Sequence, residues 1–364
     1  MPEPFKNQFD GALAQRIAGR LAAGWPDFDR ERFIAVATHG LAGLEMKARA
    51  MQFCAALEAT LPGDFDAAAA LLRPAMQGDG ALASWALWPV GEYIARHGQH
   101  DPELALDLLH ALTQRFSAEF AIRPFIVNHP ELVFATLARW VRDDSEHVRR
   151  LVSEGSRPRL PWGLRLKALI ADPSPTLPLL RALQDDESDY VRRSVANHLN
   201  DIAKDHPQLI AGWLKEHLPG ASKQRQQLLR HASRTLVKRG DAKVLAAWGL
   251  GKKLRGEATL AIRPARVALG GSVALTATLA SSAAKPQALV VDYAVHHVKA
   301  DGSTSPKVFK GWKLVLPAHD TVTLAKAHSL EPVTIRRYHA GRHRVTLQVN
   351  GETVAESAFT LRLA

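Results

Sequence analysis

The sequence predicts an all-α HEAT-like repeat solenoid followed by an all-β immunoglobulin-like sandwich. Residues 144–154 and 187–197 share a Val-Arg-Arg core and lie 43 residues apart. That spacing falls within the roughly 40 to 47 residues of two-helix HEAT-type units, which bury their apolar faces on each other. After residue 255 the helical pattern gives way to alternating β-branched runs. We therefore expect two domains, at residues 1–255 and 256–364.

The first domain shows helical periodicity from Asp10 to about Trp248. Apolar residues recur there at spacings of three and four, as in Leu13, Ile17 and Leu21. Prolines interrupt the pattern where helices are expected to begin or end, because proline lacks the amide donor. These prolines are Pro62, Pro130, Pro173, Pro207 and Pro219.

The second domain contains seven runs that read as strands within about 110 residues, which predicts an immunoglobulin-like sandwich. Asn350-Gly351 between the last two runs is typical of a tight hairpin, and Tyr338 is placed for a tyrosine corner. Residues 250–256 are expected to be the linker. The runs are residues 260–269, 272–279, 288–295, 312–316, 321–324, 344–349 and 356–361.

Composition excludes several classes of protein. The chain has 364 residues, of which 46% are hydrophobic and 23% charged, which is ordinary for a globular protein. The single cysteine, Cys54, lies in an apolar helical run and is expected to pack rather than to react. No basic leader precedes an apolar core, and no apolar run approaches the roughly 20 residues of a membrane span. We expect a cytoplasmic protein.

The formal charge of +11 is unevenly distributed. Residues 256–364 hold 13 Lys and Arg against 7 acidic residues, and residues 116–240 hold 20 against 14. The remainder is close to neutral. Positive charge on both the repeat core and the second domain is expected if both face a polyanion such as DNA.

Motifs of other chemistries are missing from the sequence. His339 and His343 have the spacing of metal ligands, but they lie in a turn that enters a strand and no third ligand follows. There is no Gly-x-Ser-x-Gly elbow and no glycine-rich phosphate loop. We expect neither a metal nor a cofactor.

Basic residues recur at corresponding positions of the two repeated segments. Such a row would bind phosphates without reading bases, although each arginine could instead pair with a neighbouring acid at the surface. Trp162 is expected either to touch the deoxyribose or lesion, or to be buried in the core. The set is Arg149, Arg150, Arg192 and Arg193 with Arg157, Arg159 and Lys204, and Asn197 and Asn200 lie near the same edge.

Three blocks of this region, residues 118–125, 148–162 and 190–204, resemble the AlkC family of bacterial DNA alkylation-repair glycosylases, relatives of AlkD. Phe33, residues 44–49 and residues 338–351 are also similar to that family, so the resemblance covers nearly the whole chain. It implies removal of small cationic alkylated bases, 3-methyladenine and 3-methylcytosine, from double-stranded DNA, without base flipping.

The resemblance also implies the catalytic residues Glu119, Glu154 and Asp201. Carboxylates suit this chemistry, because an anion stabilises the oxocarbenium-like sugar that forms as a cationic base leaves neutral. Helix caps or arginine-pairing acids are the structural alternative for each. Arg123, which follows Glu119 in the first block, is included in the expected DNA-binding set.

A second hypothesis remains open, in which the chain is a non-catalytic HEAT-type scaffold for DNA or protein and its acids are structural. Clustering of the three acids with the arginines would favour the glycosylase, and dispersal would favour the scaffold. We expect alkylated double-stranded DNA as partner, nucleoid association when bound to DNA, no membrane contact, and no assembly beyond a monomer.

Overall fold

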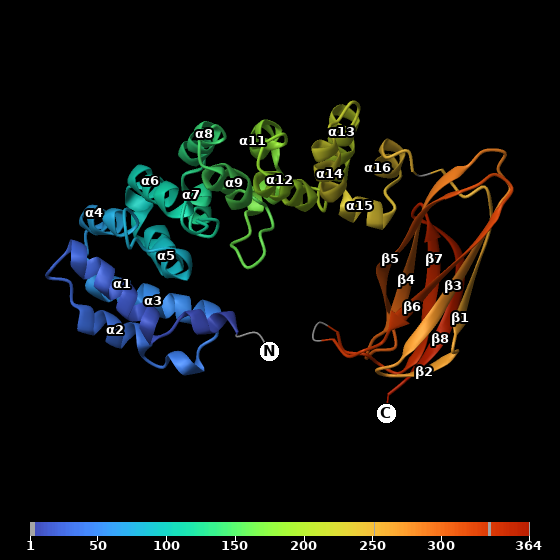
Figure 1. The fold of residues 1–364 in the computed structure, drawn as a ribbon, viewed down its shortest axis with the longest axis horizontal. Helices are drawn as coiled ribbons and strands as arrows, with labels where there is room; N and C mark the ends of the chain where they lie inside the picture. Colours follow the sequence, from blue (N-terminus) through green and yellow to red (C-terminus); the bar gives the residue numbers. More distant parts are fainter. Residues whose placement is uncertain (1–3, 251, 334–335, 364) are drawn as a thin grey trace. The chain divides into compact units, whose positions relative to one another are not determined.

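The computed structural model describes residues 4–250, 252–333 and 336–363. Helices extend to Ala247 and strands begin at Gly256, which confirms the predicted fold class (Figure 1). The contacts divide the chain into two compact units, Met1–Asp205 with Ser222–Ala232, and His206–Ala221 with Ser233–Ala364. The division at residues 255 and 256 follows the change from helix to strand and stays a prediction as a functional boundary.

The first unit consists of helices joined by short turns. Its α-helices are α1 (Gly11–Gly24), α2 (Arg30–Thr38), α3 (Met46–Thr60), α4 (Phe65–Ala75), α5 (Leu87–His97), α6 (Pro102–Thr113), α7 (Arg123–Asn128), α8 (Pro130–Trp140), α9 (Glu146–Gly155), α10 (Lys167–Ala171), α11 (Leu177–Leu183), α12 (Asp189–Ile202) and α14 (Lys223–Ala232). Short 3-10 turns are η1 (Phe5–Gln8), η2 (Leu41–Gly43), η3 (Ser84–Ala86), η4 (Gly98–His100) and η5 (Ser174–Thr176).

Helix starts in this unit are fixed by side chains that accept from otherwise unpaired amides. Asp10 accepts from the amide of Leu13 at 2.8 Å, and Asp101 accepts from that of Leu104 at 3.0 Å. Elsewhere proline occupies the first helical position, as Pro130 does in α8. The prediction that prolines mark helix boundaries is therefore confirmed for α8, and aspartates mark other helix starts in the same way.

Helices α9 and α12 are the two copies of the repeated segment, and they pack on each other. Val148 and Val191 are the equivalent buried residues. The first arginine of each copy closes the start of its helix: Arg149 donates from Nη1 to the carbonyls of residues 143 and 144 at 2.9 and 3.0 Å, and Arg192 donates to that of Glu187 at 2.7 Å. The repeated Val-Arg-Arg segment thus corresponds to a repeated structure, in which the valine is buried and the first arginine binds the carbonyls that precede its helix.

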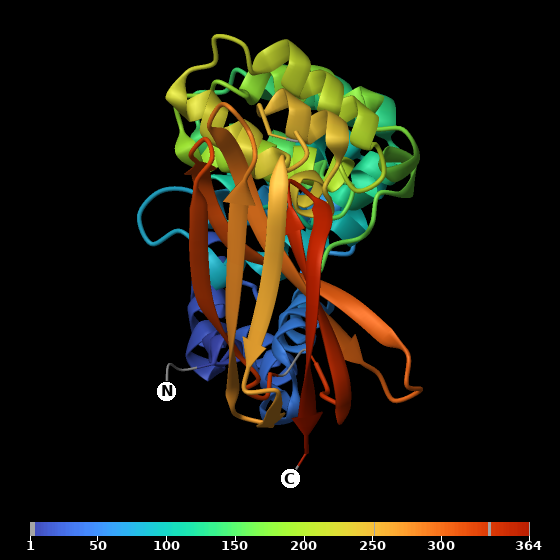
Figure 2. The same ribbon diagram turned by 90° about the vertical axis from the view of Figure 1, so that its right-hand side faces the viewer.

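The second unit combines three helices, α13 (Pro207–His217), α15 (Arg234–Arg239) and α16 (Ala242–Ala247), with a β-sandwich. One sheet has the order β1-β3-β6 and the other β2-β8-β7-β4-β5. The long strands of the sandwich are the orange and red arrows in Figure 2. The strands are β1 (Gly256–Arg263), β2 (Arg266–Ala268), β3 (Ser272–Ser281), β4 (Gln287–Val298), β5 (Thr304–Leu316), β6 (Thr321–Ser329), β7 (Gly341–Val349) and β8 (Glu352–Arg362).

The sandwich core lies between the two sheets, where Leu275 and Leu279 of β3 pack in clusters with residues of β4 and β7. The run predicted at residues 260–269 is divided between the sheets, because β1 ends at Arg263 and β2 pairs with β8 in parallel. Residues 304–311, which the sequence analysis did not assign to a strand, form the first half of β5.

The Asn350-Gly351 hairpin between β7 and β8 is confirmed, with φ of 50° and 82° at the two residues. Its tip packs against the end of α15, so that a Cβ added to Gly351 would lie 2.3 Å from the Cα of Gly240. The Asn350 side chain accepts from the amide of Val290 at 2.9 Å. Tyr338 packs on the sandwich core, and its predicted role in a tyrosine corner stays a prediction, because residues 334 and 335, just upstream, lie outside the described residues.

Within the described parts of the chain, no helix is both long and apolar enough to cross a bilayer.

Candidate active site and nucleic-acid interface

The three predicted catalytic carboxylates come from successive layers of the helical unit (Figure 1). Glu119 lies in the turn before α7, Glu154 in the last turn of α9 and Asp201 in the last turn of α12. A continuous series of ion pairs joins them. The acids are therefore clustered rather than dispersed, which is the outcome expected of a glycosylase.

Arg150 links the first two acids. Its Nη1 lies 2.7 Å from Oε2 of Glu119, and its Nη2 lies 3.7 Å from Oε1 of Glu154. Ser117 reinforces the first pair, because its hydroxyl donates to Glu119 at 2.7 Å and accepts from Arg150 at 2.8 Å. The ring of Tyr190 lies under the guanidinium at 4.9 Å, so Arg150 is held on two sides.

Arg157 links the second and third acids. Its Nη1 donates to Oε1 of Glu154 at 2.6 Å, and its Nη2 lies 2.8 Å from Oδ2 of Asp201. The remaining oxygens also have partners: Ser194 donates to Oε2 of Glu154 at 2.6 Å, and Lys204 donates to Oδ1 of Asp201 at 2.8 Å. Both carboxylates are fixed in orientation before any ligand binds.

The network becomes more buried along its length. The exposed fraction of the side chain falls from 16% in Glu119 to 8% in Glu154 and 2% in Asp201. Burial lowers the pKa of Arg157, but the carboxylates of Glu154 and Asp201 outweigh it and the net shift is upward. The arginine therefore stays charged, as a bridge between two anions requires.

His198 of α12 lies against Ser153 of α9, next to this network, and is fully buried. Burial lowers its pKa to about 4, more than the carbonyl of Ser153 and the nearby Asp201 raise it. Its Nδ1 lies 2.9 Å from the Ser153 carbonyl, which can only accept, so the proton is on Nδ1. His198 is neutral and adds no positive charge under the carboxylates.

Glu119 differs from the other two acids in one respect. Its Oε1 has no partner among the described residues, whereas both oxygens of Glu154 and of Asp201 are occupied. A free oxygen on a partly exposed carboxylate can accept a hydrogen bond from a water or a sugar. The arrangement thus offers one available acceptor beside two buried anions.

The structure buries three arginines of the expected DNA-binding set, which corrects the sequence prediction: Arg157, within the carboxylate network described above, and Arg123 and Arg149. Arg123 is fully buried and donates to the carbonyls of Gly155 at 2.7 Å and Leu164 at 2.6 Å. Arg149 is buried against Asp186, with Nε 2.7 Å from Oδ2. Neither guanidinium has a surface to offer a phosphate. Burial lowers the pKa of Arg123 to about 10, with the positive charge of Arg157 adding to the effect.

The remaining basic residues differ in accessibility. Arg193 is 66% exposed and pairs only with Asp189, one turn earlier on α12. Lys204 is part-exposed, and Arg159 is held by Asp205 through two contacts of 2.7 Å. Arg192 donates to the backbone carbonyl of Glu187, just before α12, and this contact holds the guanidinium at the start of the helix. Arg193, Lys204 and Arg159 are therefore the ones that a phosphate can reach.

Trp162 is 88% exposed, which excludes the buried-core alternative. It lies in the loop between α9 and α10 with a φ of 63°. Arg123 ties this loop down at both ends through the carbonyls named above, so a fixed loop presents a large apolar ring to solvent. Tryptophan is enriched at interfaces, so an exposed ring on a fixed loop is a candidate binding group.

The two asparagines take different positions. Oδ1 of Asn197 accepts a hydrogen bond from Nε2 of His231 on α14 at 2.8 Å, and Asn200 is buried. The sequence analysis did not single out Ser117, Ser194, Tyr190 and His198, although the last three lie within the block at residues 190–204. The roles of those last three depend on the pairing of α9 with α12, which no spacing in the sequence specifies.

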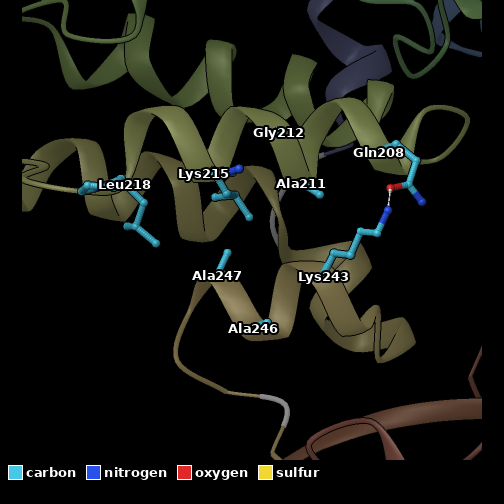
Figure 3. Close-up of a pocket in the computed structure, with 10 residues that line it drawn as sticks. Gln208, Ala211, Gly212, Lys215, Leu218, Lys243, Ala246 and Ala247 are labelled. Atoms are coloured by element: carbon cyan, nitrogen blue, oxygen red, sulfur yellow. Dashed lines mark hydrogen bonds between the residues drawn. The ribbon is translucent and has the colours of Figure 1, made fainter.

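Other cavities and clusters do not compete with this site. A groove of about 690 Å³ lies between α13 and α16 and is lined mainly by small or apolar residues such as Ala211, Leu218 and Ala247 (Figure 3). Lys243 crosses it to Gln208 at 2.8 Å, and no carboxylate lines it. Among the residues that the structure describes, no group of three His, Cys, Asp or Glu side chains could hold a metal ion.

Comparison with known proteins identifies the family. A family model described as a DNA alkylation repair enzyme matches residues 90–236, and a model of the C-terminal Ig-like domain of the uncharacterised protein YhaZ matches residues 257–363. The uncharacterized protein YhaZ of Bacillus subtilis (strain 168) is 34% identical over 349 residues, which cover 95% of this chain and 96% of the relative.

A solved structure is similar over the whole length. The alkylpurine DNA glycosylase AlkC of Pseudomonas fluorescens, bound to DNA that contains an abasic site analog, matches 99% of this chain and 100% of its own with a TM-score of 0.91 and 36% identity. The chain belongs to the AlkC family. The carboxylate network of this AlkC-family chain falls within the residues matched by the DNA alkylation repair model.

Proposed function

We propose that this chain is a DNA glycosylase of base excision repair that hydrolyses the N-glycosidic bond of small cationic alkylated bases in double-stranded DNA. The observation that carries the proposal is the network in which Glu119, Glu154 and Asp201 are held by Arg150 and Arg157. Family membership and the DNA-bound AlkC relative support the same activity.

The network favours a function over a purely structural role. Buried ion pairs contribute little net stability, because desolvating each charge costs about as much as the pairing returns. Apolar side chains would hold α9 and α12 together as well or better. A site that needs anions close to a sugar accounts for the charges, whereas a scaffold does not.

Substrate chemistry follows from the groups present. A cationic base such as 3-methyladenine or 3-methylcytosine leaves neutral, so no acid must protonate it. Electrons of the bond to C1′ pass to the departing base, and the sugar becomes an oxocarbenium-like cation that the carboxylates stabilise. Water then adds at C1′ and gives up a proton to a carboxylate, leaving an abasic site. Neutral lesions are expected to be poor substrates.

We assign the roles within the site from accessibility. Glu119, with its free oxygen, is the acceptor that positions the attacking water. Glu154 and Asp201, which are more buried than Glu119, supply the negative charge that stabilises the sugar cation. Lys204 exchanges its contact with Asp201 for a phosphate contact when DNA binds, which leaves three carboxylates against Arg150 and Arg157 and so a net negative charge facing the sugar.

Exposed basic residues and Trp162 fit binding of the DNA backbone and the damaged nucleotide. Trp162 contacts the deoxyribose or the lesion, and Arg193, Arg159 and Lys204 contact phosphates. Because the acids are held by helices rather than by an enclosed pocket for a base, excision proceeds without flipping the base out of the helix. The sandwich domain, with 13 basic against 7 acidic residues, acts as a second DNA clamp, and the protein is associated with the nucleoid when bound.

The experiment that tests this proposal is release of free base from methylated double-stranded DNA by the purified chain. Free 3-methyladenine and 3-methylcytosine, with abasic sites that cleave in alkali, are the expected products. DNA binding without any released base would favour the non-catalytic scaffold instead.

A further inference from the structure

A second cavity, of about 230 Å³, lies at one end of the sandwich. The end of β4, the start of β5 and the segment before β7 line it. Cationic or polar side chains dominate the lining, and none of its residues is acidic: they include Lys299, Ser305, Lys307, Arg336, Arg337 and His339. The cavity is therefore polar, basic and large enough for a tetrahedral anion.

The basic side chains of this pocket lack paired carboxylates, although Asp301, whose pKa is lowered by hydrogen bonds from Ser303 and by the charge of Lys299, lies near one of them. Within the described residues, none of its lysines or arginines forms an ion pair with a carboxylate. Elsewhere on the sandwich, by contrast, Lys253 pairs with Glu352 and Arg344 with Glu356. Burial lowers the pKa of Lys307, and the positive charges of Arg336 and Lys238 lower it further, as expected in an uncompensated electropositive site.

One of the two arginines that line the pocket, Arg336, is held by a neighbouring histidine. Nη1 of Arg336 lies 2.8 Å from Nε2 of His297. A guanidinium only donates, so Nε2 of His297 accepts and the ring proton is on Nδ1, which is buried without a partner. Tyr338 packs beside the same guanidinium at 5.8 Å. The other N–H groups of Arg336 are left to a ligand.

Histidine protonation does not disturb this arrangement near neutral pH. Burial and, to a smaller extent, the positive charge of the neighbouring Arg336 together lower the pKa of His297 to about 3. The ring therefore remains a neutral acceptor. Lys307 lies over the ring of Phe309 at 5.5 Å, so a second cation is also positioned before a ligand arrives.

We propose that this pocket, with Arg336 and Lys307 as its principal donors, binds one phosphate of the DNA backbone. The inference rests on the proposed function, because it takes DNA as the partner of the sandwich. A guanidinium and an ammonium beside a serine hydroxyl suit a phosphate, which offers several acceptor oxygens. Such a contact fixes the position of the protein along the backbone and reads no base.

The test uses the full chain and an undamaged duplex, so that it does not depend on excision. Lys307→Gln and Arg336→Gln each remove one donor, and Lys285→Gln is the matched control because Lys285 is exposed in the turn before β4, at the other end of that strand. Affinity is measured over a range of salt concentrations, and thermal unfolding shows whether each variant is folded.

Each pocket variant is expected to bind the duplex roughly tenfold more weakly than the parent, the scale of one hydrogen-bonded charge. The slope of log affinity against log salt should decrease by about 0.9, the value for one phosphate contact. Lys285→Gln should retain the parent slope. Lys307→Gln leaves the Arg336–His297 contact intact, so it remains informative if Arg336→Gln is poorly folded.

Parent-like affinity and salt slope in folded Lys307→Gln would overturn the proposal. Weaker duplex binding in the pocket variants of a parent that releases no base would support the phosphate site while contradicting the glycosylase. Base release by the parent with unchanged variants would support the glycosylase while contradicting the phosphate site.

Discussion

At the scale of single residues, the site depends on how each carboxylate oxygen is occupied. Glu154 and Asp201 have every oxygen paired, and Glu119 keeps one free. The types and numbers of these acids were predictable from their resemblance to a family. Their partners were not, because Arg157 reaches Asp201 across 44 residues of sequence and only the packing of α9 on α12 brings the two together.

Ser194 provides a test of that positioning. Its hydroxyl donates to Oε2 of Glu154 at 2.6 Å inside the protein. Ser194→Ala should let the carboxylate rotate and should lower single-turnover excision roughly tenfold, since a hydrogen bond to a charged group is worth about 1.5–3 kcal/mol. Affinity for lesion DNA should stay at the parent value.

The control for Ser194→Ala is Ser174→Ala, an exposed serine whose hydroxyl pairs with Asp172. It should excise at the parent rate. If Ser194→Ala changes thermal stability but leaves the excision rate untouched, Ser194 supports the fold alone.

At the scale of elements, the repeated Val-Arg-Arg segments illustrate what a pattern specifies. Both copies form helices, as the 43-residue spacing predicts, and the equivalent valines are buried. Their arginines do not form one row of phosphate contacts, however. Arg149 and Arg192 close helix entrances, whereas Arg150 enters the carboxylate network and Arg193 faces solvent. The sequence repeat shows which arginines occupy equivalent positions in the two helices. The role of each arginine depends on the residues that pack against its helix.

The loop that carries Trp162 should depend on Arg123. Arg123→Met keeps much of the side-chain volume but removes two hydrogen bonds, to the carbonyls of Gly155 and Leu164. We expect a loss of about 3 kcal/mol in the free energy of unfolding, from two charge-assisted bonds. Limited proteolysis in residues 156–166 should become faster.

Trp162→Ala separates the two effects of that loop. It should leave stability within about 0.5 kcal/mol of the parent, because the ring is exposed, while weakening binding to lesion DNA. Parent-like proteolysis and stability in Arg123→Met would contradict the anchoring role of the arginine.

At the scale of the whole molecule, the order of solenoid and sandwich was predictable because helical and strand periodicities differ so clearly. The compact units were not, because α13, α15 and α16 belong with the sandwich although their sequence is helical like the rest of the first 250 residues. The hairpin tip explains part of this grouping. Gly351 and Gly240, which are 111 positions apart in the sequence, approach so closely that a Cβ on Gly351 would clash with Gly240.

Both units contain buried neutral histidines, which predicts acid sensitivity. Burial lowers the pKa to about 4 in His198 and His328 and to about 3 in His297. Unfolded histidine titrates near 6.5, so below that pH the unfolded chain binds protons that the folded chain does not. Stability is therefore full above pH 6.5 and should decline as the pH falls toward 4.

Thermal unfolding between pH 7 and 4.5 measures this decline, which each histidine can steepen by up to about 1.4 kcal/mol per pH unit. His328→Phe should reduce the dependence on pH of the unfolding temperature of the sandwich. His319→Asn, at an exposed turn position, should not. An unfolding temperature that is constant down to pH 4.5 would contradict the assignment of neutral buried rings.

The central claim, that buried carboxylates carry out base excision, is tested most directly by single-turnover release of 3-methyladenine from a methylated duplex. Glu154→Gln and Asp201→Asn keep the shape of each side chain and remove its charge, and Asp189→Asn changes an exposed acid of α12 as a matched control. We expect the two site variants to lose on the order of 10²-fold or more in rate, the scale of one placed electrostatic group, with lesion-DNA affinity close to the parent and Asp189→Asn unaffected. Parent rates of excision in both site variants would show that the acids are structural and that the account is wrong.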